Sequence, residues 1–356
     1  MKKKKIRINR ILIRNYKGID ELELDFTAPK MTHDPDLMVI GSENGIGKTS
    51  VIECCALLLL SLSPNFRNDA FIGMERYSSI DIFDLLIRAG ADNIEIFGDI
   101  VYDIETLKDV GIRIHRDRTV EKFYSKEKKE HTFKGGIFEL VRSVCGFTPN
   151  PVMVDLFLLF HSYRKVQEGN LELGMMIDHE KRNTIWDGLS NIFFRNDSIM
   201  SAFKLIILRS IMSDANLFDK VDENESDCVI EKLNELVKIY AGGKIGKLRP
   251  SVDNTIDFRI NPINNESQTF SFDGLSSGQK EIISTLFLIW YNTKENPSVV
   301  FIDEPELHLN SQWHSGFVNA LTRIAPQNQY ILATHSEYIM DSVEKYQRIF
   351  ISSGDK

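Results

Sequence analysis

The sequence predicts an α/β fold with a mixed central sheet, an antiparallel β subdomain and a helical lobe. Short apolar runs begin at Leu37, Val299 and Ile331, and each ends in glycine or polar residues, as strands buried on both faces do. Residues 93–125 instead alternate apolar and polar side chains, which is typical of antiparallel strands. Helical periodicity fills residues 181–241, so we expect the lobe there.

Length and composition limit the possible classes of protein. At 356 residues the chain suits roughly two domains, or one core with a long insertion. Its net charge of −8 provides no global field for nucleic acid, so any such contact needs a local basic patch. The four cysteines include no Cys-x-x-Cys pair, which argues against a zinc site and fits a reducing cytoplasm. The apolar run Cys54–Leu60 is shorter than the ~20 residues of a membrane helix, so we expect no membrane segment.

The first residues predict a hairpin that leads into the strand at Leu37. Isoleucines alternate with polar residues from Ile6 to Ile13, and leucines alternate with acidic residues from Glu21 to Phe26. Lys17 and Gly18 lie between these runs and are the expected turn.

A phosphate-binding loop is expected directly after the strand at Leu37. Gly45 and Gly47 lack the Cβ atoms that would keep a phosphate from the backbone, and Lys48 and Thr49 open a helix. Lys48 can reach the β and γ phosphates of ATP, and the Thr49 hydroxyl is placed to hold Mg²⁺. The strict motif has glycine at position 42, where this chain has serine. The predicted nucleotide-binding residues here are Ser42, Glu43, Asn44, Gly45, Ile46, Gly47, Lys48, Thr49 and Ser50.

The middle of the chain predicts further sheet structure. We expect three antiparallel strands at 93–103, 111–118 and 120–125, followed by a solvated hairpin tip at 126–130. Residues 151–160 are almost continuously apolar, which predicts a single central strand buried on both faces. Ligands in α/β sheets lie beyond the carboxyl ends of strands. The residues after this strand that could approach a nucleotide are therefore His161, Ser162, Tyr163, Arg164 and Gln167.

The segment 241–250 is a glycine-rich basic loop in sequence, with Lys244, Lys247 and Arg249. It is either a plain flexible turn or a nucleic-acid contact.

Two acids and a histidine follow the later apolar strands. Asp303 and Glu304 come directly after Val299–Ile302, which places both carboxylates at a strand end. Asp303 would hold Mg²⁺, while Glu304 would orient and deprotonate the attacking water. His335 follows the strand at Ile331 and can donate a hydrogen bond to the γ phosphate. The predicted catalytic residues are Glu304, His335 and Lys48, and the predicted metal ligands are Thr49 and Asp303.

With these residues, the chain resembles the ABC-type ATPase heads of the RecF, SMC and OLD group, which are P-loop NTPases. The stretch SENGIGKT resembles the Walker A motif, LSSGQ the ABC signature, VVFIDE the Walker B motif and LHLN the D-loop, and His335 resembles the switch histidine. The resemblance covers 6–62 and 270–352. It implies a homodimer or higher homo-oligomer in which two heads sandwich two ATP molecules. Residues of one chain's signature would complete the partner's site: Ser276, Ser277, Gly278 and Gln279.

Two motif positions depart from this family's usual pattern. Ser277 stands where the signature usually has glycine, and Asn310 stands where the D-loop usually has aspartate. The family's Q-loop glutamine has one candidate, Gln167. The resemblance divides the chain into an N-terminal part of the ATPase core at 1–165, a helical lobe with a hairpin insertion at 166–270, and a C-terminal part of the core at 271–356.

The resemblance also implies a function. Similar stand-alone heads occur in Septu-like and retron-associated anti-phage systems, where they partner an effector. Since the sequence shows no metal-nuclease motif, we expect a cytoplasmic ATPase that regulates a separate effector, such as a nuclease. The first alternative is a RecF-like repair ATPase that binds DNA through Lys2–Lys5 and the segment 244–249. The others are the ATPase subunit of a transporter and an ATP-binding scaffold with negligible turnover.

Overall fold

The structure is a computed structural model that describes residues 5–26, 28–31, 34–42, 47–62, 85–117, 119–125, 128–134, 144–145, 152–154, 156–162, 203–204, 206–208, 223–246, 249–250, 256–263, 268–307 and 309–352. The chain forms two compact units. The first comprises Met1–Ser162, Thr293–Leu307 and Ser311–Lys356, and the second comprises Tyr163–Asn292 and His308–Asn310.

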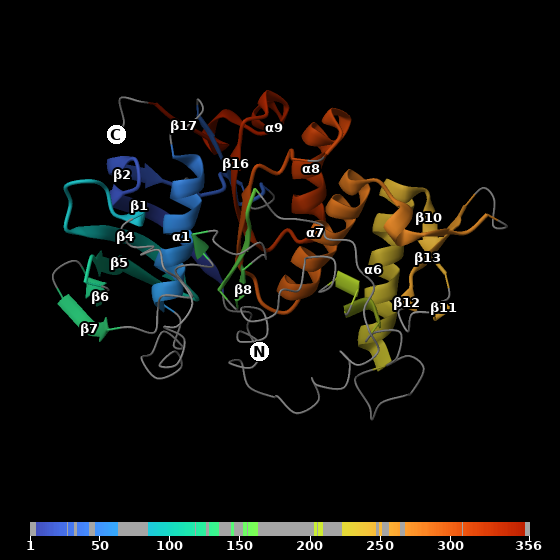
Figure 1. Cartoon of the computed structure of the whole chain (residues 1–356), viewed down its shortest axis with the longest axis horizontal. Helices are drawn as coiled ribbons and strands as arrows, with labels where there is room; N and C mark the ends of the chain where they lie inside the picture. The colour runs from blue at the N-terminus through green and yellow to red at the C-terminus, as the bar shows by residue number, and fades with distance from the viewer. Residues whose placement is uncertain are drawn as a thin grey trace. The chain divides into compact units, whose positions relative to one another are not determined.

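The first unit contains an antiparallel sheet of six strands in the order β2-β1-β4-β5-β6-β7 (Figure 1). The strands are β1 (Ile6–Tyr16), β2 (Ile19–Asp25), β4 (Asn93–Tyr102), β5 (Glu105–His115), β6 (Thr119–Ser125) and β7 (Lys128–Lys134). The predicted hairpin is confirmed, since Tyr16 pairs with Ile19 around the turn at Lys17 and Gly18. The three strands predicted between 93 and 125 are present as β4, β5 and β6, although β5 begins at Glu105 and not at 111.

The predicted hairpin tip at 126–130 is partly wrong. Lys128 already pairs with Ser125, so residues 128–130 begin β7 and continue the sheet, while 126 and 127 lie outside the described residues. Charged residues suit this strand because β7 is the edge of the sheet, where lysine and glutamate discourage pairing with other chains.

A second sheet in the same unit has the order β17-β3-β16-β15-β9-β8. Its strands are β3 (Leu37–Ser42), β8 (Val152–Val154), β9 (Phe157–Phe160), β15 (Val299–Asp303), β16 (Gln329–Thr334) and β17 (Arg348–Ile351). All neighbours are parallel except β8 and β9. The single central strand predicted at 151–160 is therefore partly wrong: β9 is fully buried inside the sheet as expected, but it covers only 157–160. β8 pairs antiparallel with β9 and forms the edge of the sheet.

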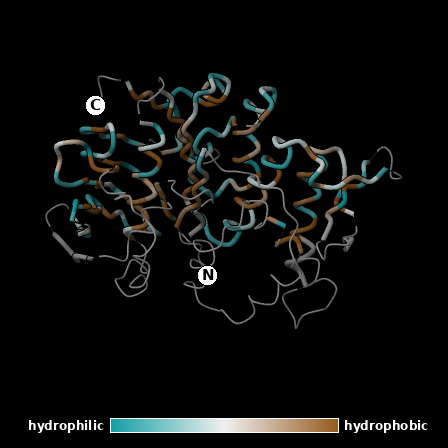
Figure 2. Tube along the Cα trace, viewed as in Figure 1, coloured by the Kyte–Doolittle hydropathy of each residue, from teal (hydrophilic) through white to brown (hydrophobic). Residues whose placement is uncertain are grey.

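Helix α1 (Lys48–Leu62) contacts strands of both sheets (Figure 1). Thirteen of its fifteen residues are buried, because a helix between two apolar surfaces needs no polar face. Figure 2 shows hydrophobic stretches along this helix and along the strands beside it. The helix that begins the nucleotide site is thus held from two sides.

Buried polar contacts join β1 to the parallel sheet. The Gln329 side chain accepts a hydrogen bond from the Ile8 amide at 2.8 Å and donates to the Ile8 carbonyl at 2.9 Å. Arg7, also buried, forms an ion pair of 2.9 Å with Asp36, just before β3. Most polar atoms in these contacts are hydrogen-bonded, which lowers the penalty of burying them, and Asp36 Oδ1 is the exception.

The first unit also contains α8 (Ser311–Ile324), α9 (Glu337–Asp341) and the 3-10 helix η4 (Lys345–Gln347). No helix among the described residues is long and apolar enough to cross a membrane.

The second unit contains α6 (Glu223–Ala241), β10 (Gly243–Ile245), β11 (Arg249–Pro250), β12 (Ile256–Asp257), β13 (Arg259–Pro262), β14 (Phe270–Ser271), the 3-10 helix η3 (Phe272–Gly274) and most of α7 (Ser277–Thr293). Within the helical pattern predicted at 181–241, Leu233, Leu236 and Val237 are buried on α6, whereas Ile230 is half-buried. The predicted loop at 241–250 is partly wrong, because β10 pairs with β13 and β11 pairs with β12. The helical pattern at 185–200 lies outside the described residues.

Candidate functional site

The carboxyl ends of three neighbouring parallel strands lie at one level. Asp303 at the end of β15 pairs with Ala333 of β16, and Ala333 pairs with Ile40 of β3. Beyond this level, β15 leads to Glu304, and β16 leads to Thr334 and His335. Strand β3 ends just before the glycine loop. In parallel α/β sheets this edge is where ligands bind. The sheet pairing therefore brings the predicted acids and the histidine to the end of β3, which precedes the predicted phosphate-binding loop.

Lys48 and Thr49 start α1 and face the other site residues. Lys48 is 5% exposed, and its Nζ lies 3.3 Å from His335 Nδ1. The Thr49 hydroxyl donates a hydrogen bond of 2.9 Å to Asp303 Oδ2. Gly47 before them has a φ of +95°, a conformation that side chains other than glycine rarely adopt. Ser42 ends β3, Ser50 is buried on α1, and Glu43, Asn44, Gly45 and Ile46 lie outside the described residues.

The electrostatic surroundings of Lys48 combine burial with three nearby acids. Burial lowers the pKa of Lys48, while the charges of Glu304, Asp303 and Glu306 raise it in part. A buried cation at a helix start is also a favourable partner for a phosphate group, which would replace the water lost on burial.

Glu304 has a strained backbone. Its φ is +48°, in the left-handed region that non-glycine residues seldom occupy. The Glu304 N–H donates a hydrogen bond of 2.8 Å to the Ala333 carbonyl, which extends the sheet by one residue before the chain turns. The side chain then places Oε1 3.6 Å from His335 Nε2. His335 thus lies between Lys48 on one ring nitrogen and Glu304 on the other.

The Thr49–Asp303 pair has the chemistry of a magnesium site. Magnesium prefers oxygen ligands and usually takes one or two carboxylates, with water and phosphate oxygens filling its other positions. Asp303 is 1% exposed and its carboxylate lies against the Thr49 hydroxyl, so both predicted ligand oxygens are already together. The described residues contain no group of three or more His, Cys, Asp or Glu that could hold a metal ion.

Two glutamates at this site were not predicted from the sequence. Glu306 accepts hydrogen bonds of 2.7 Å from the Thr334 hydroxyl and from the His335 amide. Glu53, on α1 and 2% exposed, accepts from the Tyr16 hydroxyl at 2.9 Å and from Lys17 Nζ at 2.6 Å. The sequence did contain a signal for each. Glu306 is the second glutamate in the stretch DEPE, and Glu53 is a lone charged residue inside an apolar helix.

The predicted signature residues lie at the start of α7, in the second unit. Ser276 and Ser277 are exposed, whereas Gly278 is buried. Gln279 accepts a hydrogen bond from the Ser276 amide at 3.0 Å and donates one of 2.9 Å to the Tyr240 carbonyl at the end of α6. The motif is therefore tied to α6 while its two serines face outward.

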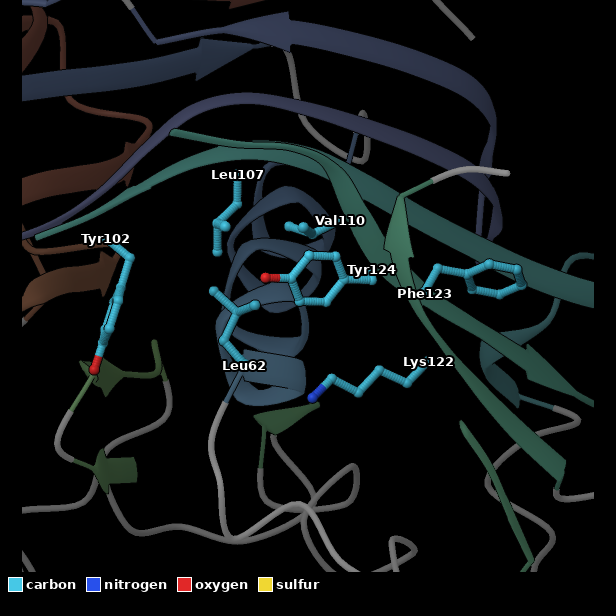
Figure 3. A pocket seen from close by; sticks show the side chains of 7 residues that line it. All are labelled: Leu62, Tyr102, Leu107, Val110, Lys122, Phe123 and Tyr124. Atoms are coloured by element: carbon cyan, nitrogen blue, oxygen red, sulfur yellow. The ribbon is translucent and has the colours of Figure 1, made fainter. Parts of the chain in front are cut away.

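The remaining predicted residues come after β9. His161 follows β9 and is buried, Ser162 comes next, and Tyr163, Arg164 and Gln167 lie outside the described residues. A pocket of about 200 Å³ lies between the end of α1 and the antiparallel sheet (Figure 3). Its lining contains none of the predicted site residues and consists of Leu62, Tyr102, Leu107, Val110, Lys122, Phe123 and Tyr124.

The fold and the grouped motifs define the class of protein: a P-loop ATPase head. The family model described as "AAA domain, putative AbiEii toxin, Type IV TA system" matches residues 158–341, just over half of the chain. The chain therefore belongs to this AAA-domain family. A second AAA-domain model matches residues 10–140.

Two curated proteins are similar in sequence. The retron Vc95 probable ATPase of Vibrio cholerae serotype O1 biovar El Tor is 23% identical over 412 residues, a match that covers 99% of this chain and 74% of that protein. The Septu protein PtuA of Bacillus mycoides strain KBAB4 is 43% identical over 53 residues, which cover 15% of this chain and 7% of that protein. The second match concerns a short segment of this chain only.

Solved SMC heads share the fold. The Smc head bound to the C-winged helix domain of ScpA aligns with a TM-score of 0.53 and 15% identity, covering 96% of this chain and 94% of that one. An Smc head from Pyrococcus furiosus with an extended coiled coil gives 0.54 and 15%, covering 97% and 93%. The predicted fold class and the resemblance to SMC-type heads are confirmed. The chain thus belongs to an AAA-domain family and has the fold of SMC heads.

Proposed function

We propose that this chain binds and hydrolyses ATP, dimerises around the nucleotide and thereby regulates a separate effector in anti-phage defence. The observation that carries the proposal is the meeting of Lys48, Asp303, Glu304 and His335 at the carboxyl ends of β3, β15 and β16. Phosphoryl transfer depends on positioning and charge more than on covalent chemistry, and these side chains provide both.

Each residue has a distinct part in the proposed reaction. Lys48 binds the β and γ phosphates, and Thr49 and Asp303 hold Mg²⁺, which neutralises charge on the phosphates when bound. Glu304 orients the attacking water and accepts its proton, and His335 donates a hydrogen bond to the γ phosphate. The lysine and histidine already lie within 3.3 Å of one another, so one phosphate group can contact both.

The proposed dimer uses the signature of the partner chain. Ser276, Ser277, Gly278 and Gln279 would complete the γ-phosphate site formed by Lys48 of the other chain. The outward-facing serines at the start of α7 support this role, since a helix start favours an anion. The division of the chain into 1–165, 166–270 and 271–356 remains part of the same proposal.

The Glu304→Gln variant tests the ATPase and the dimer together. We expect hydrolysis to fall at least a hundredfold, since general base catalysis contributes about 10²–10⁴. Light scattering of this variant should show a monomer that becomes a dimer when ATP and Mg²⁺ are added. The matched control is Glu337→Gln, an exposed glutamate on α9, which should hydrolyse ATP as the wild type does. Wild-type turnover by the Glu304→Gln protein would refute the catalytic assignment.

Regulation of an effector needs a test in cells. The similarity to a retron ATPase and to a Septu protein supports the defence role. Cells that carry the chain with its native neighbouring genes should resist phage, and Glu304→Gln should abolish this protection while Glu337→Gln keeps it. Protection that persists in the Glu304→Gln cells would contradict control of the effector by ATP hydrolysis.

DNA binding by a RecF-like ATPase is the alternative. Lys244 is exposed on β10, which suits a backbone contact, whereas Arg10 and Arg14 on β1 are paired with carboxylates. Residues 1–4 and Lys247 lie outside the described residues. This alternative predicts DNA binding that falls steeply with salt and weakens in Lys244→Ala. Binding that Lys244→Ala leaves unchanged would exclude this contact.

A further inference from the structure

Glu306 makes two hydrogen bonds to the loop that carries His335. It lies two residues after Glu304, in the turn that follows β15. Its Oε2 accepts from the Thr334 hydroxyl and its Oε1 accepts from the His335 backbone amide, both at 2.7 Å. An ionised carboxylate has two acceptor oxygens and no donor, so the two neighbouring donors match it in number and kind. Bonds to a charged acceptor are also stronger than neutral ones.

The loop at 334–336 needs such support because it continues beyond the sheet. β16 ends at Thr334, and the His335 side chain is 36% exposed. The Thr334 hydroxyl also accepts from the Ser336 amide at 2.9 Å, and Ser336 Oγ lies 3.1 Å from His314 Nδ1 on α8. Glu306 therefore fixes the first half of the loop, while α8 contacts the second half.

The position of the His335 ring depends on this backbone. The ring reaches Lys48 with Nδ1 at 3.3 Å and Glu304 with Nε2 at 3.6 Å. A shift of about 1 Å at a reacting group can cost roughly a hundredfold in rate, so small movements of the loop matter. A carboxylate that holds the His335 amide would hold the ring at the distance that the γ phosphate requires.

We propose that Glu306 is a positioning residue that fixes His335 for ATP hydrolysis. This inference rests on the proposed ATPase function and deepens it. Glu306 acts through the Thr334 hydroxyl and the His335 amide. Its charge also lies near Lys48, so a test must separate hydrogen bonding from charge.

Kinetics of two substitutions make this separation. Glu306→Ala removes both bonds, and we expect kcat to fall about tenfold to a hundredfold while KM for ATP changes less than about threefold. Glu306→Gln removes the charge but keeps one acceptor for the His335 amide, and its NH₂ can donate to the Thr334 hydroxyl, so it should recover much of the loss. Glu337→Gln is the matched control and should leave both constants unchanged. If Glu306→Gln were as slow as Glu306→Ala, charge rather than positioning would be responsible.

A double-mutant cycle shows whether Glu306 acts through His335. In a His335→Ala background, Glu306→Ala should cost less than about threefold in kcat, because the ring to be positioned is absent. Additive losses would overturn the proposal. If the wild type hydrolyses ATP and Glu306→Ala hydrolyses it equally fast, the positioning role of Glu306 is overturned and the ATPase function stands. If the wild type does not hydrolyse ATP, the ATPase function itself is refuted.

Hydrogen exchange tests the contact without turnover. In the nucleotide-free protein, Glu306→Ala should accelerate exchange of the amide at His335 at least tenfold, while Glu337→Gln leaves it unchanged. Equal exchange in wild type and Glu306→Ala would mean that Glu306 does not hold this backbone, which would overturn the positioning role.

Discussion

Replacing Glu53 with glutamine should remove a pH dependence from the stability of the first unit. Glu53 is 2% exposed on α1 and contacts the Tyr16 hydroxyl and Lys17 Nζ, both from the hairpin β1–β2. Burial raises the pKa of Glu53 from its ordinary 4.5 to about 7, although the charge of Lys17 and hydrogen bonds from Lys17 and Tyr16 lower it in part. The folded protein therefore binds a proton at this carboxyl more tightly than the unfolded chain does.

The sign and the size of the effect follow from linkage. Because the folded pKa is the higher one, the stabilisation is fully present below pH 4.5 and is lost as the pH rises through 7. A difference of about 2.5 pKa units corresponds to about 3 kcal/mol in all. Between pH 5 and pH 7.5, where most other carboxyl groups remain ionised, the loss is about 2 kcal/mol.

Urea denaturation at several pH values measures this difference. The free energy of unfolding of wild type minus that of Glu53→Gln should fall by about 2 kcal/mol from pH 5 to pH 7.5, with equal m-values. The same difference for the exposed Glu337→Gln should stay constant across this range. A constant difference for Glu53→Gln would mean that the buried carboxyl does not titrate in this window, and the reasoning from burial would be refuted.

Three further substitutions test the metal site, the sheet junction and the glycine loop. Asp303→Asn should raise the Mg²⁺ concentration for half-maximal ATPase activity about tenfold, because a buried ligand loses its charge; an unchanged titration would contradict the metal role. Gln329→Leu should lower the free energy of unfolding, measured by urea denaturation, by about 2–4 kcal/mol, since the Ile8 amide and carbonyl would be left buried without partners. A loss below about 1 kcal/mol would mean that water replaces the glutamine. Gly47→Ala should weaken binding of a fluorescent ATP analogue and destabilise the fold by about 1 kcal/mol, because φ is +95° and the new Cβ would lie 3.4 Å from Ile19; wild-type affinity would show that the loop tolerates the strain.

The fold was predictable where the sequence pattern is local. The alternation of apolar and polar residues between Asn93 and Ser125 predicted the antiparallel strands. The apolar run before Asp303 predicted a buried strand that ends in polar residues. The run at 151–160 misled because periodicity alone does not distinguish one buried strand from two short antiparallel ones. The segment at 241–250 misled because glycine and basic residues also occur in short strands, and the partner strands β13 and β12 lie outside the segment.

The candidate site was predictable where a residue type follows a strand or a glycine loop. Lys48, Asp303, Glu304 and His335 could be found because each stands at a defined position after an apolar run. Glu306 could not be found in this way, because its partners, Thr334 and His335, lie 28 and 29 residues further on. Its role depends on the pairing of β15 with β16, which is a tertiary fact.

The contacts that hold α1 and β16 connect the antiparallel sheet to the candidate site. Tyr16 and Lys17 bind Glu53, one turn after Thr49, and Ile8 binds Gln329, at the start of the strand that ends before His335. A shift of β1 would therefore act on both the helix that bears Lys48 and the strand that leads to the histidine. The Gln329→Leu variant weakens one of these two connections, so it should also reduce the ATPase rate, measured under conditions in which the variant remains folded.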